Sequence, residues 1–231
     1  MPNINYESCE MCNFEIHKSI LIVVSDTSKL TDGTETGVWF EEFAIPYTSL
    51  IDKGYEVTTA SPNGGQIPID PESINDKWET AKIALKNVKR LCAVDYKRYD
   101  TIILPGGHGP MFDLYKNDTL GKIINDFDKK GKLIAAICHG PAGLLSAING
   151  NNNFIKNRKI TSYTNEEEFF SQKEKQIPFF LEDALKNSGA LFVQGGINSV
   201  NVTEDKNLIT AQNYNSTEAF VKKIFEYLDN N

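Results

Sequence analysis

Cys138 and His139 are the neighbouring residues with the clearest potential for nucleophilic chemistry in this sequence. They follow the apolar run Leu133–Ile137, which is typical of a buried strand, and they precede Gly140 and Pro141, which open a helix-like segment. A nucleophile on a sharp turn between strand and helix forms an elbow that exposes its side chain and brings the positive end of the helix near it. We therefore expect a reactive thiol, stabilised as a thiolate, rather than a cysteine that only packs in the core.

A second turn with chemical potential follows the apolar run Thr101–Leu104. It contains the adjacent glycines Gly106 and Gly107, followed by His108. Adjacent glycines let backbone N–H groups point into a site, which suits an oxyanion hole, although an ordinary tight turn has the same composition. The spacing fits neither a dinucleotide-binding fingerprint nor a phosphate-binding loop, so we expect no nucleotide cofactor.

The elements that must position these turns alternate along the chain. Short apolar runs predict strands at Ser19–Ser25, Glu56–Ala60, Thr101–Leu104, Leu133–Ile137, Lys159–Ser162, Leu191–Val193 and Leu208–Ala211. Amphipathic segments with caps predict helices at Val38–Asp52, Asp118–Lys130, Pro141–Ile148, Pro178–Asn187 and Ser216–Leu228. This alternation indicates an α/β fold with a mostly parallel sheet covered by helices on both faces. In such sheets the site lies at the carboxyl ends of the strands, where both turns occur.

The 231 residues, with a net charge of −7, suit one α/β domain over residues 19–231 after a polar leader over residues 1–18. A small insertion, Pro62–Lys82, follows the second strand and is a candidate lid. The charge argues against nucleic-acid binding, and no apolar run is long enough to cross a membrane. The leader has no secretory pattern, which favours a cytoplasmic location. It carries Cys9 and Cys12, which with His17 would still lack a fourth zinc ligand.

Several segments resemble the ThiJ/PfpI superfamily: AAICHGPAGLL, LPGGHGP and DGTETGVWFEEFAIPY. Two others, TASPNGGQIPIDPESI and IPFFLEDALKNSGALF, are similar to its branch of glutathione-independent glyoxalases, also called glyoxalase III or D-lactate dehydratase, some of which are chaperones. The resemblance runs from about Ser19 to the C-terminus. It implies a flavodoxin-like fold of the class I glutamine amidotransferase type, no cofactor, and a homodimer.

The resemblance also implies residue roles. Cys138 would be the nucleophile, His139 the neighbouring acid/base, and Glu42 the buried carboxyl group beside the sulfur. Close to a thiolate, a carboxyl group is pushed towards its protonated form and can then donate a hydrogen bond. An acid after the run KITSYT would orient the histidine; Glu166, Glu167 and Glu168 stand in a row there, and alignment on Tyr163-Thr164 favours Glu168.

The remaining implied positions bind an oxyanion or substrate: Gly106, Gly107 and the backbone N–H of His139. Some chaperone members carry a His/Glu metal site. Leu50 stands about where that site would need a histidine, so we expect no metal.

The function that these expectations favour is conversion of a small 2-oxoaldehyde such as methylglyoxal into D-lactate through a hemithioacetal on Cys138. Two alternatives stay open. One is a cysteine peptidase; the other is a holdase chaperone or redox-sensing stress protein in which Cys138 is an oxidisable sensor. An amidotransferase is disfavoured because its catalytic histidine lies far downstream of the cysteine, and no histidine follows His139.

Overall fold

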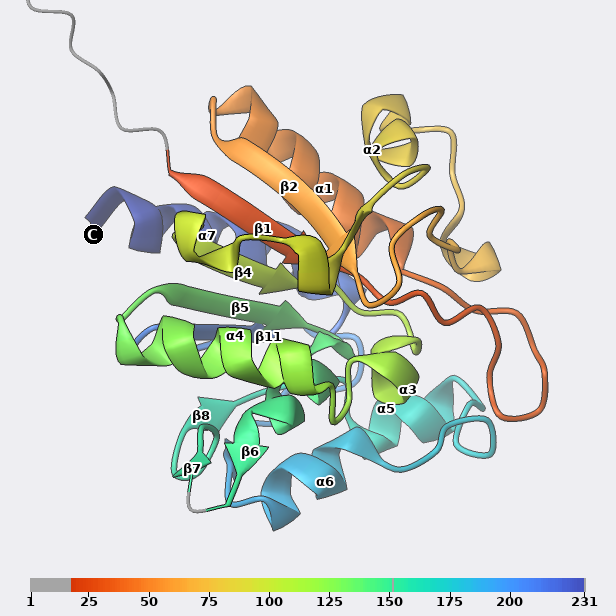
Figure 1. Cartoon of the computed structure of the whole chain (residues 1–231). Coiled ribbons are helices and arrows are strands. Elements are labelled where there is room, and N and C mark those ends of the chain that lie inside the picture. Colours follow the sequence, from red (N-terminus) through yellow and green to blue (C-terminus); the bar gives the residue numbers. More distant parts are fainter. Residues whose placement is uncertain (1–17, 151, 231) are drawn as a thin grey trace, which may run out of the picture.

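A seven-stranded sheet forms the centre of the computed structural model, which describes residues 18–150 and 152–230. The strand order is β10-β11-β5-β4-β1-β2-β3, and every neighbouring pair is parallel except β10 and β11. The arrowheads of the parallel strands point to one edge of the sheet, where α3 and α5 lie (Figure 1). The strands of this sheet are β1 (Ser19–Val23), β2 (Glu56–Ser61), β3 (Lys89–Arg90), β4 (Thr101–Leu104), β5 (Leu133–Ile137), β10 (Val202–Asp205) and β11 (Leu208–Ala211).

Different helices cover the two faces of the sheet (Figure 1). One face carries α1 (Phe40–Asp52) and α7 (Thr217–Asn230), and the other carries α4 (Asp118–Lys129) and the 3-10 helix η4 (Gly140–Ala147). The remaining helical segments are η1 (Pro71–Ser73), α2 (Glu79–Ala84), η2 (Leu91–Ala93), η3 (Tyr96–Arg98), α3 (Pro110–Asp113), α5 (Asn165–Phe170), α6 (Leu181–Asn187) and η5 (Tyr214–Ser216).

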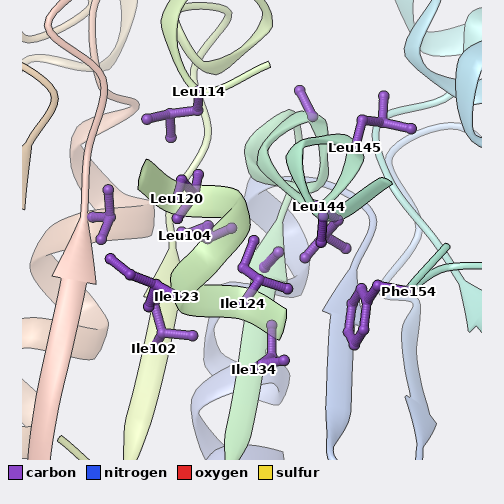
Figure 2. Close-up of a cluster of buried hydrophobic side chains, with 14 of the residues drawn as sticks. Ile102, Leu104, Leu114, Leu120, Ile123, Ile124, Ile134, Leu144, Leu145 and Phe154 are labelled. Carbon is purple, nitrogen blue, oxygen red and sulfur yellow. The ribbon is translucent and has the colours of Figure 1, made fainter. Parts of the chain in front are cut away.

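Alternation along the strands divides the apolar side chains between two cores. In β4, Ile102 and Leu104 face α4, whereas Ile103 joins the core under α1 and α7. Figure 2 shows Ile123 and Ile124 of α4 lying over β4 and β5. Each of these side chains is fully buried, which contributes about 1.5–3 kcal/mol per residue before entropy is subtracted. The sheet is thus packed between two apolar cores beneath its carboxyl edge.

The predicted strand alternation and the helices on both faces are confirmed, but two predicted strands do not join the main sheet. Lys159–Ser162 and Leu191–Val193 contain β8 (Lys159–Ile160) and β9 (Leu191–Phe192), which pair only with each other. The antiparallel edge strand β10 was not predicted, because its sequence VTED is polar and leaves Glu204 exposed. A further small hairpin joins β6 (Ile148–Asn149) to β7 (Asn152–Asn153).

The other predicted elements differ mainly at their ends. Pro141–Ile148 is the 3-10 helix η4, and Pro178–Asn187 becomes helical only at Leu181. The insertion after β2 contains η1 and α2. Cys92 is exposed. Cys9, Cys12 and His17 lie outside the described residues.

No helix within residues 18–150 or 152–230 is long and apolar enough to cross a membrane.

The packing of α4 on η4 yields a prediction about Gly121. A Cβ atom at this position would lie 2.1 Å from the carbonyl oxygen of Ser146, so the two helices are in backbone contact there. Although alanine favours an isolated helix, we expect Gly121→Ala to lower the free energy of unfolding by about 1–3 kcal/mol, because the overlap must push η4 away. Denaturant unfolding measures this change. The exposed neighbour Lys122 provides the control, and an equal effect of Lys122→Ala would contradict the packing argument.

Candidate active site

Cys138 lies on the predicted elbow, in a left-handed backbone conformation with φ of 59°. Its N–H donates to the carbonyl oxygen of Ala211 and its own carbonyl accepts from the N–H of Tyr163, at 2.9 Å each. These two bonds to neighbouring segments stabilise a backbone conformation that residues other than glycine rarely adopt. The turn also needs Gly140, because a Cβ there would lie 2.0 Å from the carbonyl oxygen of Leu104.

The double-glycine turn after β4 lies against the elbow. A Cβ on Gly106 would meet the Cβ of Cys138 and the backbone nitrogen of His139, each at 2.8 Å. The N–H of Gly106, which we expected to bind an oxyanion or substrate, donates to Oε2 of Glu42 at 2.9 Å. The backbone N–H of Gly107 faces the sulfur of Cys138 and therefore remains the nearer donor from this turn.

Cys138, His139 and Glu168 form a hydrogen-bonded chain. The sulfur of Cys138 lies 3.3 Å from Nδ1 of His139, and Nε2 of the same ring lies 2.5 Å from Oε1 of Glu168. Burial, and then the adjacent ring of His108, lower the pKa of His139. Burial alone would raise the pKa of Glu168, but the charges and hydrogen bonds of the two histidines outweigh it and lower that pKa to about 2. In the resting site, the neutral imidazole of His139 is therefore hydrogen-bonded to the ionised carboxylate of Glu168.

The three consecutive glutamates at the start of α5 have separate environments. Glu166 is exposed. Glu167 is buried and forms a capping box with Thr164, while its Oε1 accepts from the side chains of Gln212 and Asn213. Glu168 alone of the three reaches His139. The structure thus places the carboxylate favoured by alignment, and not its two neighbours, behind the imidazole.

Glu42 lies on the other side of the sulfur, on the first turn of α1, and is fully buried. Burial raises its pKa to about 8, so that it carries a proton at pH 7. Its Oε1 accepts no hydrogen bond from the described residues. The thiol of Cys138 is the side chain that interacts with this carboxyl group. A protonated Oε1 can therefore donate towards sulfur.

The thiol itself differs from the expectation of a preformed thiolate. Burial and the nearby Glu42 raise the pKa of Cys138 well above its ordinary value. Cys138 is 5% exposed, and the segment that follows it is a 3-10 helix instead of a regular α-helix, so desolvation outweighs the helix end. Formation of the thiolate requires a base, and Nδ1 of His139 is in position to accept the proton.

His108 is a site residue that sequence reasoning placed in the turn without giving it a role. Its Nε2 lies 3.2 Å from Oε2 of Glu168, and its ring centroid lies 4.1 Å from that of His139. Its position directly after the double glycine was the available signal. In the described part of the chain, His108, His139 and Glu168 are the one group of three whose ligand atoms come close enough to hold a metal ion.

A pocket of about 200 Å³ opens onto the sulfur. Its wall includes Trp39, Tyr163, Phe170 and Tyr214, and Lys173 pairs there with Glu72 of the insertion, at 2.7 Å. Part of the candidate lid therefore reaches the entrance. The lining residues are Trp39, Glu72, Gly107, His108, Cys138, His139, Tyr163, Phe170, Ser171, Lys173, Asn198 and Tyr214.

The separate environments of the glutamates predict different effects of the same substitution. Glu168→Gln should slow any reaction of the thiol that needs His139 as a base by about 10²-fold or more, because the imidazole loses its ionised partner. Glu166→Gln, on the exposed side of the same helix, should have no effect. The rate of Cys138 alkylation by iodoacetamide at pH 7 measures both. Equal rates in the two variants would show that Glu168 does not support the histidine.

The buried proton on Glu42 predicts a pH-dependent stability. Between about pH 4.5 and pH 8 the folded protein holds a proton on Glu42 that the unfolded chain releases, so stability falls as the pH rises through this interval. Glu42→Gln removes this dependence and should raise the free energy of unfolding at pH 7 by up to about 3 kcal/mol. Urea unfolding at pH 5 and pH 7 measures the change, with the partly exposed Glu41→Gln as control. A destabilised Glu42→Gln protein at pH 7 would be the contrary result.

Comparison with known proteins places this geometry in a family. The model of the DJ-1/PfpI family matches residues 18–227. The chain is 30% identical over 192 residues to a glutamine amidotransferase-like class 1 domain-containing protein 1 from Xenopus laevis, covering 81% of this chain and 83% of the relative. It is 27% identical over 210 residues to a glutathione-independent glyoxalase from Schizosaccharomyces pombe, covering 81% and 87%.

A similar solved structure is glyoxalase III from Candida albicans. It superposes with a TM-score of 0.79 at 25% identity and covers 90% of this chain and 96% of its own. This chain belongs to the DJ-1/PfpI family.

Proposed function

We propose that this protein is a glyoxalase that converts methylglyoxal and similar 2-oxoaldehydes to 2-hydroxy acids, D-lactate in the case of methylglyoxal, without glutathione or a metal. The observation that carries the proposal is the neutral thiol of Cys138 between a base, His139, and a proton donor, Glu42, inside a small pocket. The relatives that bear the name glyoxalase support it.

The first step uses the hydrogen-bonded chain. His139 accepts the thiol proton, the sulfur attacks the aldehyde carbon, and the developing alkoxide takes up that proton to give a neutral hemithioacetal. The backbone N–H groups of Gly107 and His139 stabilise the oxygen while it is charged. The ionised Glu168 stabilises the imidazolium that exists between the two proton transfers.

The following steps rearrange the hemithioacetal to a thioester through an enediolate, and water then cleaves the thioester. The overall change adds one water molecule to the oxoaldehyde and requires no oxidant or reductant. A pocket of about 200 Å³ has room for roughly six water molecules, so a substrate of five non-hydrogen atoms fits with space to spare. This small volume suits a small molecule better than an extended peptide chain.

The cytoplasmic location and the homodimer stay predictions from the sequence.

The central test is an assay with methylglyoxal and no glutathione. We expect the wild type to consume the aldehyde and form D-lactate, and Cys138→Ala to lose at least about 10³-fold of this rate, because no other residue lining the pocket can supply the sulfur. Prior treatment with a chelator should leave the wild-type rate unchanged. Lactate is measured enzymatically and the aldehyde by derivatisation. Equal turnover by wild type and Cys138→Ala would refute the proposal.

A further inference from the structure

The glyoxalase route needs a base for the carbon-bound proton. The hydrogen-bonded residues Cys138, His139 and Glu168 already have other roles in the reaction. That proton sits on the former aldehyde carbon and must move to the neighbouring carbon. The groups able to move it must line the pocket and have a free lone pair. The two acid/base side chains beside the sulfur, Glu42 and His139, both interact with other groups in the structure.

Glu42 lacks the free lone pair of a base. It is fully buried, its Oε2 accepts from the N–H of Gly106, and its other oxygen carries a proton at pH 7 because burial raises its pKa to about 8. It does not line the pocket. Its position suits donation towards the sulfur of Cys138, which is the opposite task.

His139 faces the sulfur with its only available nitrogen. Its Nε2 is bonded to Glu168, and Nδ1 lies 3.3 Å from the sulfur of Cys138. Once the sulfur is bound to carbon, the same nitrogen remains close to the sulfur and to the oxygen it has just protonated. We therefore assign to His139 the transfer of the proton from the sulfur to the oxygen of the hemithioacetal.

His108 has the free nitrogen that the other two lack. The ionised carboxylate of Glu168 can only accept, so Nε2 of His108, 3.2 Å from Oε2, must donate, and the proton of that ring is fixed there. Nδ1 of His108 then holds a lone pair. It makes no hydrogen bond with the described residues, and His108 lines the pocket while keeping 8% of its surface exposed. One carboxylate thus orients two imidazoles, each with a basic Nδ1.

We propose that His108 is a second catalytic base of this site and that it carries the hydrogen of the substrate carbon, while His139 serves the sulfur. The proposal rests on the glyoxalase function above. Nδ1 of His108 takes the proton from the carbon bound to sulfur. The electron pair of that C–H bond forms a double bond to the neighbouring carbon, whose carbonyl oxygen becomes an enediolate oxygen.

The imidazolium of His108 is stabilised by Glu168 and returns the same proton to the neighbouring carbon. The double-bond electrons form this new C–H bond. The hydroxyl proton on the first carbon passes to the enediolate oxygen, and that hydroxyl oxygen becomes the carbonyl of the thioester. No proton or electron is gained or lost before water cleaves the C–S bond.

The test replaces His108 by glutamine, whose amide can still donate to Glu168 but which has no basic nitrogen. We expect kcat for lactate formation to fall by about 10²–10⁴-fold. Methylglyoxal deuterated at the aldehyde carbon should then show a larger primary isotope effect than with the wild type. Alkylation of Cys138 by iodoacetamide should stay within about threefold of the wild type, whereas His139→Gln should lose both lactate formation and alkylation.

A second variant distinguishes the loss of a basic nitrogen from a structural defect caused by the substitution. His108→Ala opens a space beside Glu168, and added imidazole should restore part of its lactate formation. Full turnover by His108→Gln, or a parallel loss of its alkylation rate with no rescue of His108→Ala, would overturn the assignment of His108. Absence of lactate from the wild type would instead overturn the proposed function, so the two failures are distinguishable.

Discussion

The left-handed backbone at Cys138 is the constraint on which the site depends. In a free loop, a residue other than glycine with a φ of 59° would relax to another backbone conformation. Here the hydrogen bonds to Ala211 and from Tyr163 tie the residue to β11 and to the segment before α5. Because these partners come from later parts of the chain, the elbow forms only when the sheet is complete. The core under α4 and the core under α1 and α7 therefore support the reactive conformation from both faces.

Two buried carboxyl groups have opposite protonation states within one site. Glu42 has a single backbone donor, the N–H of Gly106, and the thiol of Cys138 beside it, and burial keeps it protonated, with a pKa of about 8. Glu168 is buried almost as well, but two imidazole donors compensate for its charge and lower its pKa to about 2. The difference lies in the charges and hydrogen bonds of the two histidines and not in exposure. The sulfur thus has a proton donor on one side and a base backed by a fixed charge on the other.

The sequence was sufficient to predict the alternation of strands and helices along the chain, the elbow and the double-glycine turn. These features depend on local periodicity and on small residues at fixed offsets. It was less informative wherever a long-range contact decides. The polar strand β10 and the separate pair β8–β9 are fixed by their partners. Likewise, Gly106 is occupied by Glu42, from a helix 64 residues earlier. The protonation of Cys138 follows from burial, which no local pattern reveals, and the link between His108 and Glu168 spans 60 residues.

The short helix α5 leaves no room for a change in the length of its segment. Glu167 closes the capping box and accepts from Gln212 and Asn213, while Glu168, the next residue, holds the two histidines. Adjacent positions on a helix point about 100° apart, so a single inserted residue would bring Glu167 to the reactive position, and a single deleted residue would bring Phe169 there. Among variants of this protein, the segment between Tyr163 and Glu168 can thus tolerate substitutions at its exposed positions, but its residue count is fixed from both ends.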